Sequence, residues 1–313
     1  MWKYLDNVTY DEFLLSFNLV KTKDIKKYKN TLYYLSNNID GNYIEYEIPK
    51  KSGGMRKIYE PSPLLKSVQR NILHNILEEK RLSSYAKAYR KNMSIIDNAI
   101  AHVQKKIILK LDIKNFFDSI TYKMVYNSCF NDTLYPKPIG VLLTELCTYQ
   151  GILPQGAVTS SFISNVIMRE FDEIIGLYCK NNNISYTRYS DDMTFSGDFA
   201  VSEVIKLVKL ELKKIGFKLN DKKIRIISNK KRQVVTGIIV NEKVNVAKEY
   251  KRKIRMNMYY IKKYGIDDHL RKIRVDNKTK YINTLIGRIN FVLLVSPSHE
   301  FQEYINYFKR GNN

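Results

Sequence analysis

One short segment, Tyr189-Ser190-Asp191-Asp192, constrains this chain more than any other. β-prone residues from Ile184 to Tyr189 lead into it and Met193-Thr194-Phe195 follow it, which predicts a β-hairpin with two adjacent carboxylates at its tip. Adjacent carboxylates repel each other unless cations neutralise them, and Mg²⁺ prefers hard oxygen ligands that it shares with substrate phosphates. The segment therefore favours a metal site for phosphoryl transfer. The alternative is an ordinary solvated Ser-Asp-Asp turn.

A third carboxylate stands near the end of an apolar strand. The run Lys106-Ile-Ile-Leu-Lys-Leu-Asp112-Ile predicts a buried strand, so Asp112 needs a partner there. Together with Asp191 and Asp192 it would complete a two-metal site, where one cation activates an attacking hydroxyl and the other stabilises departing pyrophosphate. The alternative is that Asp112 caps the turn that follows it.

A turn-rich loop lies between these two segments and leads into a helix. Gly151, Pro154 and Gly156 specify the loop, and Thr159 or Ser160 is a suitable N-cap. The predicted helix carries an apolar stripe made of Phe162, Ile163, Val166, Ile167, Phe171, Ile174 and Ile175. A glycine loop at a helix start can approach a nucleotide closely, although plain strand-to-helix connections look the same.

In this order, the three segments resemble the catalytic motifs of the reverse transcriptase family. The resemblance implies that Asp112, Asp191 and Asp192 bind Mg²⁺ in a two-metal site and that Gln155 touches the incoming dNTP. It also implies that Phe117 stands as an aromatic gate against a ribose 2′-OH. A place in the ordinary core is the alternative for Phe117.

The resemblance continues on both sides of these motifs. Residues 48–58 resemble the family's fingers hairpin, where Arg56, and with less support Lys51, would contact the triphosphate. Cations around an exposed turn often only solvate it. Residues 216–223 resemble the next palm motif, in which Lys223 corresponds to a proton donor for pyrophosphate. A plain surface lysine is the alternative.

Two further segments are similar to motifs of bacterial retron reverse transcriptases. Asn98-Ala-Ile-Ala-His102 matches their Asn-Ala-X-X-His motif, and Val235-Thr236-Gly237 matches their Val-Thr-Gly motif. We expect both segments to contact RNA. On a helix Asn98 and His102 share one face, where they either bind RNA or brace the palm.

The charge of the chain agrees with a nucleic-acid partner. Lys and Arg number 53 against 31 acidic residues, for a formal net charge of +22. A helix over Val246 to Tyr264 is predicted to bury Val246, Tyr250, Ile254, Met258 and Ile261. Lys251, Arg252 and Arg255 lie on its other faces and are candidate RNA contacts. A merely solvated basic helix is the alternative.

Targeting signals and cysteine pairs are not evident in the sequence. No run approaches the roughly 18 apolar residues that span a bilayer, and Met1-Trp-Lys-Tyr-Leu-Asp lacks the pattern of a secretory signal. We therefore expect a cytoplasmic protein without a membrane partner. Cys129, Cys147 and Cys179 are too scattered to predict disulfides or a zinc site.

These observations predict an α+β right-hand polymerase. Residues 1–105 would form N-terminal helices and fingers, residues 106–240 a palm with an antiparallel sheet backed by helices and finger-contributing segments, and residues 241–313 an α-helical thumb that binds RNA. Residues 1 to about 35 are predicted to be helical, with Phe13, Leu14 and Phe17 on one face after a cap at Asn7 or Thr9.

The resemblance implies a retron-type RNA-directed DNA polymerase. It would copy part of a cognate structured noncoding RNA into DNA from an RNA 2′-OH, giving branched RNA–DNA (msDNA), in anti-phage defence beside an effector protein. No length remains for a fused RNase H, so a host RNase H is expected to remove the template. The alternatives are an intron-derived or abortive-infection reverse transcriptase, or a noncatalytic RNA-binding scaffold, which has no physical need for three clustered carboxylates.

Overall fold

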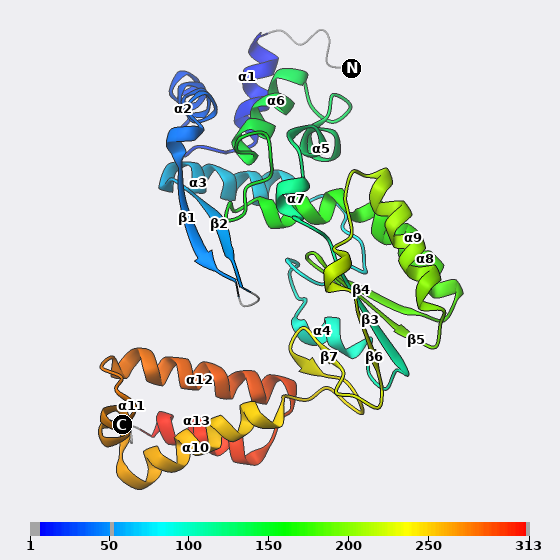
Figure 1. Cartoon of the computed structure of the whole chain (residues 1–313). Coiled ribbons are helices and arrows are strands. Elements are labelled where there is room, and N and C mark those ends of the chain that lie inside the picture. Colours follow the sequence, from blue (N-terminus) through cyan, green and yellow to red (C-terminus); the bar gives the residue numbers. More distant parts are fainter. Residues whose placement is uncertain (1–6, 51–52, 311–313) are drawn as a thin grey trace. The chain divides into compact units, whose positions relative to one another are not determined.

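The computed structural model describes residues 7–50 and 53–310, and the chain divides into two compact units (Figure 1). Unit 1 comprises residues 1–93, 109–194 and 199–225, and unit 2 comprises residues 94–108, 195–198 and 226–313. Each unit is therefore built from segments that are distant in the sequence.

Unit 1 begins with two helices, α1 (Asn7–Ser16) and α2 (Ile25–Asn37). Asp24 caps α2, because its side chain accepts a hydrogen bond from the Lys27 amide at 3.1 Å. The described part of this segment is helical over residues 7–16 and 25–37, in agreement with the predicted N-terminal helices, and the chain turns between them. Leu14 is buried as predicted, and Phe13 and Phe17 pack edge to face with ring centroids 5.0 Å apart. The caps predicted at Asn7 or Thr9 lie outside the described side chains.

A two-stranded hairpin follows these helices. Strand β1 (Tyr43–Pro49) pairs antiparallel with β2 (Met55–Pro61), which places Ile48 opposite Arg56. A short 3₁₀ turn, η1 (Asp40–Asn42), precedes the hairpin, and helix α3 (Pro63–Ile72) with its π-helical extension η2 (Leu73–Leu77) follows it. Proline at the first turn of α3 is favourable because that position needs no amide hydrogen.

The central sheet is antiparallel and has the strand order β4-β5-β3-β6. Its strands are β3 (Ile107–Asp112), β4 (Ser185–Tyr189), β5 (Asp192–Gly197) and β6 (Arg225–Ser228). Strands β4 and β5 are neighbours joined at residues 190 and 191, so the predicted hairpin is confirmed. Helix α8 (Arg169–Asn181) packs against β4, and α9 (Val201–Lys214) packs against α8 (Figure 1). The α+β class with helices backing an antiparallel sheet is confirmed.

The predicted apolar stripe from Phe162 to Ile175 falls on two helices. Helix α7 (Ser160–Ile167) ends at Met168, where α8 begins anew, and Ile174 is 48% exposed instead of buried. Thr159 occupies the predicted N-cap position, but its side chain makes no capping hydrogen bond. The remaining helical elements of unit 1 are η3 (Phe117–Ser119), α5 (Tyr122–Val125), η4 (Tyr126–Phe130), α6 (Lys137–Cys147) and η5 (Asp221–Lys223).

Unit 2 has its own apolar core. Its elements are α4 (Ile95–Ile100), β7 (Val234–Val235), β8 (Ile238–Ile239), α10 (Lys248–Tyr264), α11 (Ile266–Ile273), α12 (Lys278–Val295) and α13 (His299–Lys309). The predicted stripe of α10 is confirmed, because Ile254, Met258 and Ile261 are buried and Tyr250 packs against the same cluster. No described helix is both long and apolar enough to cross a membrane. All three cysteines are buried and unpaired, as the sequence predicts.

Candidate active site

The β4–β5 turn presents the two adjacent carboxylates. Ser190 has a φ of +61°, a left-handed conformation that is uncommon for a residue with a side chain. Asp191 is half-buried and Asp192 is exposed. The carbonyl oxygen of Asp191 accepts a hydrogen bond from the Ile113 amide at 3.1 Å. This bond ties the turn to the chain immediately after Asp112, so all three predicted carboxylates belong to one edge of the sheet.

Asp112 is 6% exposed and has found partners for its charge. Its Oδ2 accepts a hydrogen bond from Lys223 Nζ at 2.8 Å, and its Oδ1 accepts one from Asn220 Nδ2 at 3.1 Å. The Asn220 amide also donates to the carbonyl oxygen of Asp112 at 2.8 Å. The expectation that a strand Asp needs a partner is confirmed, and the segment from Asn220 to Lys223 supplies that partner.

The carboxylates influence one another's ionisation. Burial raises the pKa of Asp191, and the negative charges of Asp192 and Asp112 raise it further. Desolvation also raises the pKa of Asp192, and the nearby Lys110 ammonium opposes that shift. The hydrogen bond to Asp112 raises the pKa of Lys223. The edge of the sheet therefore concentrates negative charge and favours a cation.

The donor set fits a hard divalent cation, although the side chains are not gathered around one. Among the described residues, no three Asp, Glu, His or Cys side chains lie close enough together to hold a metal ion as they stand. Asp112 forms an ion pair with Lys223, and the Lys223 ammonium supplies the positive charge at that carboxylate. Oxygen ligands from Asp112, Asp191 and Asp192 are those that Mg²⁺ prefers. Binding by all three requires Asp112 to exchange its contact with Lys223.

The glycine loop is fixed against the β1–β2 hairpin. The Tyr59 amide of β2 donates to the Gln155 carbonyl at 2.8 Å. Gly156 has a φ of +125°, and a Cβ there would lie 2.7 Å from the Tyr59 carbonyl oxygen, so only glycine allows this approach. The Gln155 side chain remains half-exposed, and Arg56 is exposed on the same strand as Tyr59. Lys51 lies outside the described residues.

The two phenylalanines after β3 have different environments. Phe116 is 4% exposed and packs against Phe217 with ring centroids 5.5 Å apart. Phe117 is half-buried, with its ring edge to face against Phe116. Phe116 is thus the core residue, whereas Phe117 is only partly buried.

The two retron-like motifs meet in unit 2. Asn98 Nδ2 donates to Thr236 Oγ1 at 3.4 Å, and Thr236 Oγ1 donates to the Ile95 carbonyl at 3.2 Å. His102 Nδ1 lies 2.6 Å from Ser196 Oγ. Asn98 and His102 are 1% and 0% exposed, so these side chains brace the interior. Their burial favours the bracing interpretation over direct RNA contact.

The Val-Thr-Gly segment contains a more accessible surface. Val235 is buried, Thr236 is half-buried and Gly237 is exposed. The RNA contact predicted for this segment therefore has accessible atoms only at its last two residues.

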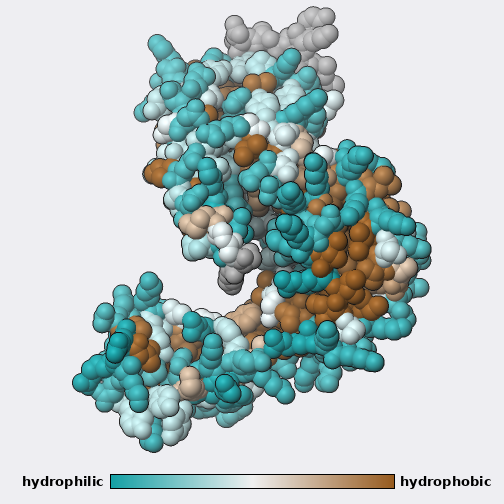
Figure 2. Space-filling model, in the orientation of Figure 1, coloured by the Kyte–Doolittle hydropathy of each residue, from teal (hydrophilic) through white to brown (hydrophobic). Residues whose placement is uncertain are grey.

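The predicted RNA-binding cations of α10 are not equivalent. Arg255 Nε and Nη2 donate to the two Glu300 oxygens at 2.7 and 2.8 Å, and Lys251 Nζ donates to Ser296 Oγ at 2.7 Å. Burial lowers the pKa of Lys251. Arg252 is exposed. Figure 2 shows that the visible face of helices α10 to α13 is predominantly hydrophilic.

Sequence reasoning missed several residues around the carboxylates. Asn220 and Lys110 lie within the motifs described above, but the hydrogen bond of Asn220 to Asp112 and the electrostatic effect of Lys110 on Asp192 depend on how the strands align. Asp172 and Arg188 are fully buried and form an ion pair with Arg188 Nη2 2.7 Å from Asp172 Oδ2. One signal was present: Asp172 lies on the buried stripe of an amphipathic helix, where a lone charge requires a partner.

Comparisons with known proteins identify the family of this chain. Residues 48–274 match the family model described as reverse transcriptase (RNA-dependent DNA polymerase). The retron Ec86 reverse transcriptase of Escherichia coli is 34% identical, with 86% of this chain and 82% of that protein aligned. The retron Ec83 reverse transcriptase of Escherichia coli is 31% identical, with 82% of this chain and 84% of that protein aligned.

A solved structure of telomerase from Candida albicans, in complex with a fragment of telomeric RNA, matches 98% of this chain and 71% of that chain at 10% identity and a TM-score of 0.46. The family match extends over most of the chain and includes the carboxylate-bearing strands, the glycine loop and strand β2 of the first hairpin. The chain therefore belongs to the reverse transcriptases, as an RNA-directed DNA polymerase of the retron reverse transcriptase group.

Proposed function

We propose that this protein copies part of a cognate structured noncoding RNA into DNA, starting from a 2′-OH of that RNA, to give branched RNA–DNA (msDNA). The observation that carries the polymerase chemistry is the placement of Asp112, Asp191 and Asp192 at one sheet edge, with the Lys223 ammonium bound to Asp112. The retron part is supported by the retron relatives and by the contact of Asn98 with Thr236, which joins the two retron-like motifs.

In this proposal Asp112, Asp191 and Asp192 hold two Mg²⁺ ions. When bound, the ions would acidify the attacking hydroxyl and would neutralise the charge that develops on pyrophosphate. The protein positions the reactants so that the hydroxyl oxygen meets the α-phosphorus of the dNTP and pyrophosphate departs. Lys223 donates a proton to the departing pyrophosphate oxygen.

Other side chains of unit 1 would select the nucleotide. Arg56 is exposed on β2 and would bind the triphosphate, and Gln155 is held on the adjoining loop, where it would contact the nucleotide. Lys51 is a further candidate for the triphosphate. Phe117 is half-buried and would exclude a ribose 2′-OH, which favours dNTP over rNTP.

We assign residues 1–105 to N-terminal helices and fingers, residues 106–240 to the palm and residues 241–313 to an RNA-binding thumb. Among the thumb cations, Arg252 is the best candidate for a phosphate contact, because Lys251 and Arg255 already have partners within the protein. Gly237 and Thr236 offer the accessible part of the Val-Thr-Gly motif to RNA. Asn98 and His102 would support that surface from the interior.

The partners and the cellular location are proposed from the relationship to retron reverse transcriptases alone. They comprise an effector protein of the same anti-phage system, a host RNase H that removes template RNA, and a cytoplasmic location. These partners are proposed by analogy with the retron group.

Incorporation of dNTPs on an RNA template tests the chemistry. The wild-type protein and the Asp191→Asn/Asp192→Asn variant are compared for incorporation with Mg²⁺ and, in parallel, for RNA binding without nucleotide. We expect the variant to lose incorporation and keep RNA affinity within about threefold, since the turn is remote in sequence from the cations of α10. Retained incorporation would rule out the metal site. Loss of both properties together would show that the variant is misfolded, and circular dichroism would detect this directly.

A further inference from the structure

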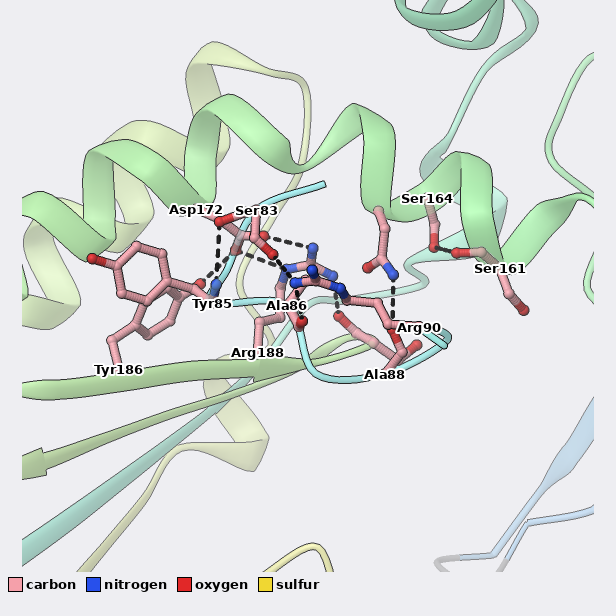
Figure 3. Close-up of polar contacts among 12 residues, drawn as sticks. Ser83, Tyr85, Ala86, Ala88, Arg90, Ser161, Ser164, Asp172, Tyr186 and Arg188 are labelled. Carbon is pink, nitrogen blue, oxygen red and sulfur yellow. Dashed lines mark hydrogen bonds and ion pairs between the residues drawn. The ribbon is translucent and has the colours of Figure 1, made fainter. Parts of the chain in front are cut away.

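A fully buried ion pair lies directly behind the carboxylate-bearing turn. Arg188 of β4 and Asp172 of α8 are both 0% exposed. Arg188 Nε donates to Asp172 Oδ1 at 2.8 Å and its Nη2 donates to Asp172 Oδ2 at 2.7 Å (Figure 3). The two parallel bonds fix the plane of the guanidinium group. Tyr186 Oη also donates to Asp172 Oδ1 at 2.8 Å, which fixes the carboxylate.

The remaining arm of the guanidinium group reaches the turn itself. Arg188 Nη1 donates to the carbonyl oxygen of Ser190 at 2.9 Å. Ser190 immediately precedes Asp191 and holds the left-handed φ of +61°. Such a conformation persists in a residue with a side chain only where surrounding contacts impose it. The bond from Arg188 is such a contact, and it acts one residue away from the two carboxylates.

The backbone of Arg188 is held on its other side. Its amide donates to the Tyr85 carbonyl at 2.9 Å, and its carbonyl accepts from the Lys87 amide at 2.8 Å. Gly176 of α8 makes room for this segment, because a Cβ there would lie 2.0 Å from the Tyr85 ring. Tyr89 Oη, from the same segment, lies 3.4 Å from Ser190 Oγ. The strand, the helix and the neighbouring segment thus converge on one short turn.

Stability alone does not account for this arrangement. Removing both charges from water is costly, and apolar residues of similar volume stabilise a buried site as well as an ion pair or better. What an apolar replacement cannot supply is the directed hydrogen bond to the Ser190 carbonyl. We propose that Arg188, oriented by Asp172, is a positioning residue that sets the Ser190 carbonyl and thereby aims Asp191 and Asp192 for cation binding. This inference rests on the proposed role of Asp191 and Asp192 as cation ligands.

The test is an all-apolar replacement of the network in the full-length protein. Arg188→Met, Asp172→Leu and Tyr186→Phe are combined, so that no buried charge and no tyrosine hydroxyl is left without its partner. Mn²⁺ binding is measured without nucleotide by electron paramagnetic resonance, beside the thermal unfolding temperature and kcat. The matched control is Tyr186→Phe alone, which keeps both Arg188 bonds to Asp172 and the bond to Ser190.

We expect the triple variant to unfold near the wild-type temperature and to bind Mn²⁺ about 10- to 100-fold more weakly, with a similar fall in kcat, as is typical when residues that orient metal ligands are lost. The Tyr186→Phe control should bind Mn²⁺ within about twofold of wild type. Mn²⁺ affinity equal to wild type in the folded triple variant would overturn the inference. Should that variant not fold, Arg188→Lys replaces it, because one ammonium cannot reproduce the fork to Asp172 together with the bond to Ser190. Weaker Mn²⁺ binding by Arg188→Lys would then support the inference, and Mn²⁺ affinity equal to wild type would overturn it.

The Asp191→Asn/Asp192→Asn variant separates this inference from the proposed function. If the Asp191→Asn/Asp192→Asn variant loses Mn²⁺ binding while the Arg188→Met/Asp172→Leu/Tyr186→Phe variant keeps it, the proposed cation site is supported and the positioning role of Arg188 is contradicted. If the Asp191→Asn/Asp192→Asn variant binds Mn²⁺ as wild type does, the proposed cation site itself fails.

Discussion

Lys223 and Asp112 form an ion pair at the sheet edge, with Lys223 Nζ 2.8 Å from Asp112 Oδ2. The lysine ammonium neutralises the least exposed of the three carboxylates, and the hydrogen bond raises the pKa of Lys223. A cation that binds Asp112 must compete with this ammonium. The displaced lysine would then be charged and next to the departing pyrophosphate, where a proton donor is needed.

Replacing Lys223 with Met therefore has opposite effects on binding and on catalysis. We expect the Mn²⁺ affinity to rise, because the competing ammonium is gone. The rate of nucleotide incorporation should fall by about 10²- to 10⁴-fold, the usual contribution of a general acid. Mn²⁺ titration and single-turnover kinetics check both effects. Lys222→Met is the matched control on the same 3₁₀ turn, and an unchanged Mn²⁺ affinity in Lys223→Met would contradict the competition.

The ionised side chain of the half-buried Asp191 should destabilise the metal-free protein at neutral pH. Its pKa is raised by burial and by the neighbouring carboxylates, so the native state binds the proton more tightly than the unfolded chain does. The cost is therefore present above the raised pKa and is relieved as pH falls toward the ordinary range of Asp. In EDTA at pH 7, Asp191→Asn should raise the unfolding temperature by roughly 2 to 4 °C for each kcal/mol relieved.

Thermal unfolding between pH 4.5 and 8 tests this expectation. The advantage of Asp191→Asn should shrink as pH falls, and Mg²⁺ should stabilise the wild type more than the variant. A variant less stable than wild type at pH 7 in EDTA would show that ionised Asp191 makes a favourable contact instead.

Phe117→Ala should relax sugar selection with little loss of stability. The residue is half-buried, so truncation removes the proposed gate without opening a sealed cavity. We expect the ratio of rNTP to dNTP incorporation to rise by at least about tenfold, which corresponds to about 1.4 kcal/mol. Phe116→Ala is the matched control: Phe116 is 4% exposed, so its truncation should cost about 3 to 5 kcal/mol of stability. An unchanged ratio of rNTP to dNTP incorporation in a folded Phe117→Ala protein would contradict the gate role and favour a purely structural role for Phe117.

The cations of α10 should differ in their dependence on salt. If Arg252 contacts one phosphate of single-stranded RNA, Arg252→Ala lowers the slope of log affinity against log salt by about 0.7. Arg255 is held by Glu300, so Arg255→Ala should act mainly on the stability of unit 2. Glu300→Gln is the control that frees Arg255 while leaving its side chain in place. A slope unchanged by Arg252→Ala would remove this residue from the RNA surface.

The sequence predicted those features that depend on local pattern. The hairpin at Tyr189 to Asp192, the buried strand ending at Asp112 and the apolar stripe of α10 follow from short-range periodicity, which neighbouring residues determine. The position of the turn between α1 and α2 does not follow from that periodicity, because it depends on Asp24, which caps the second helix.

Contacts between residues that are far apart in the sequence could not be predicted from local sequence patterns. Whether Asn98 and His102 face RNA or the interior depends on the position of Thr236 and Ser196, far along the chain. The pairing of Arg255 with Glu300 converts a surface cation on α10 into a structural contact. The Arg188 network was missed for the same reason, since its three elements meet only in the folded protein.

The most direct test of the account is the nucleic acid that the protein makes in cells. The protein is expressed with its native upstream locus beside the Asp191→Asn/Asp192→Asn variant, and nucleic acid from each purified complex is treated with DNase, RNase and debranching enzyme. We predict DNA joined to RNA, released by debranching, in the wild type alone. Unbranched DNA in the wild type would contradict priming from a 2′-OH, and RNA without DNA in both proteins would contradict a polymerase.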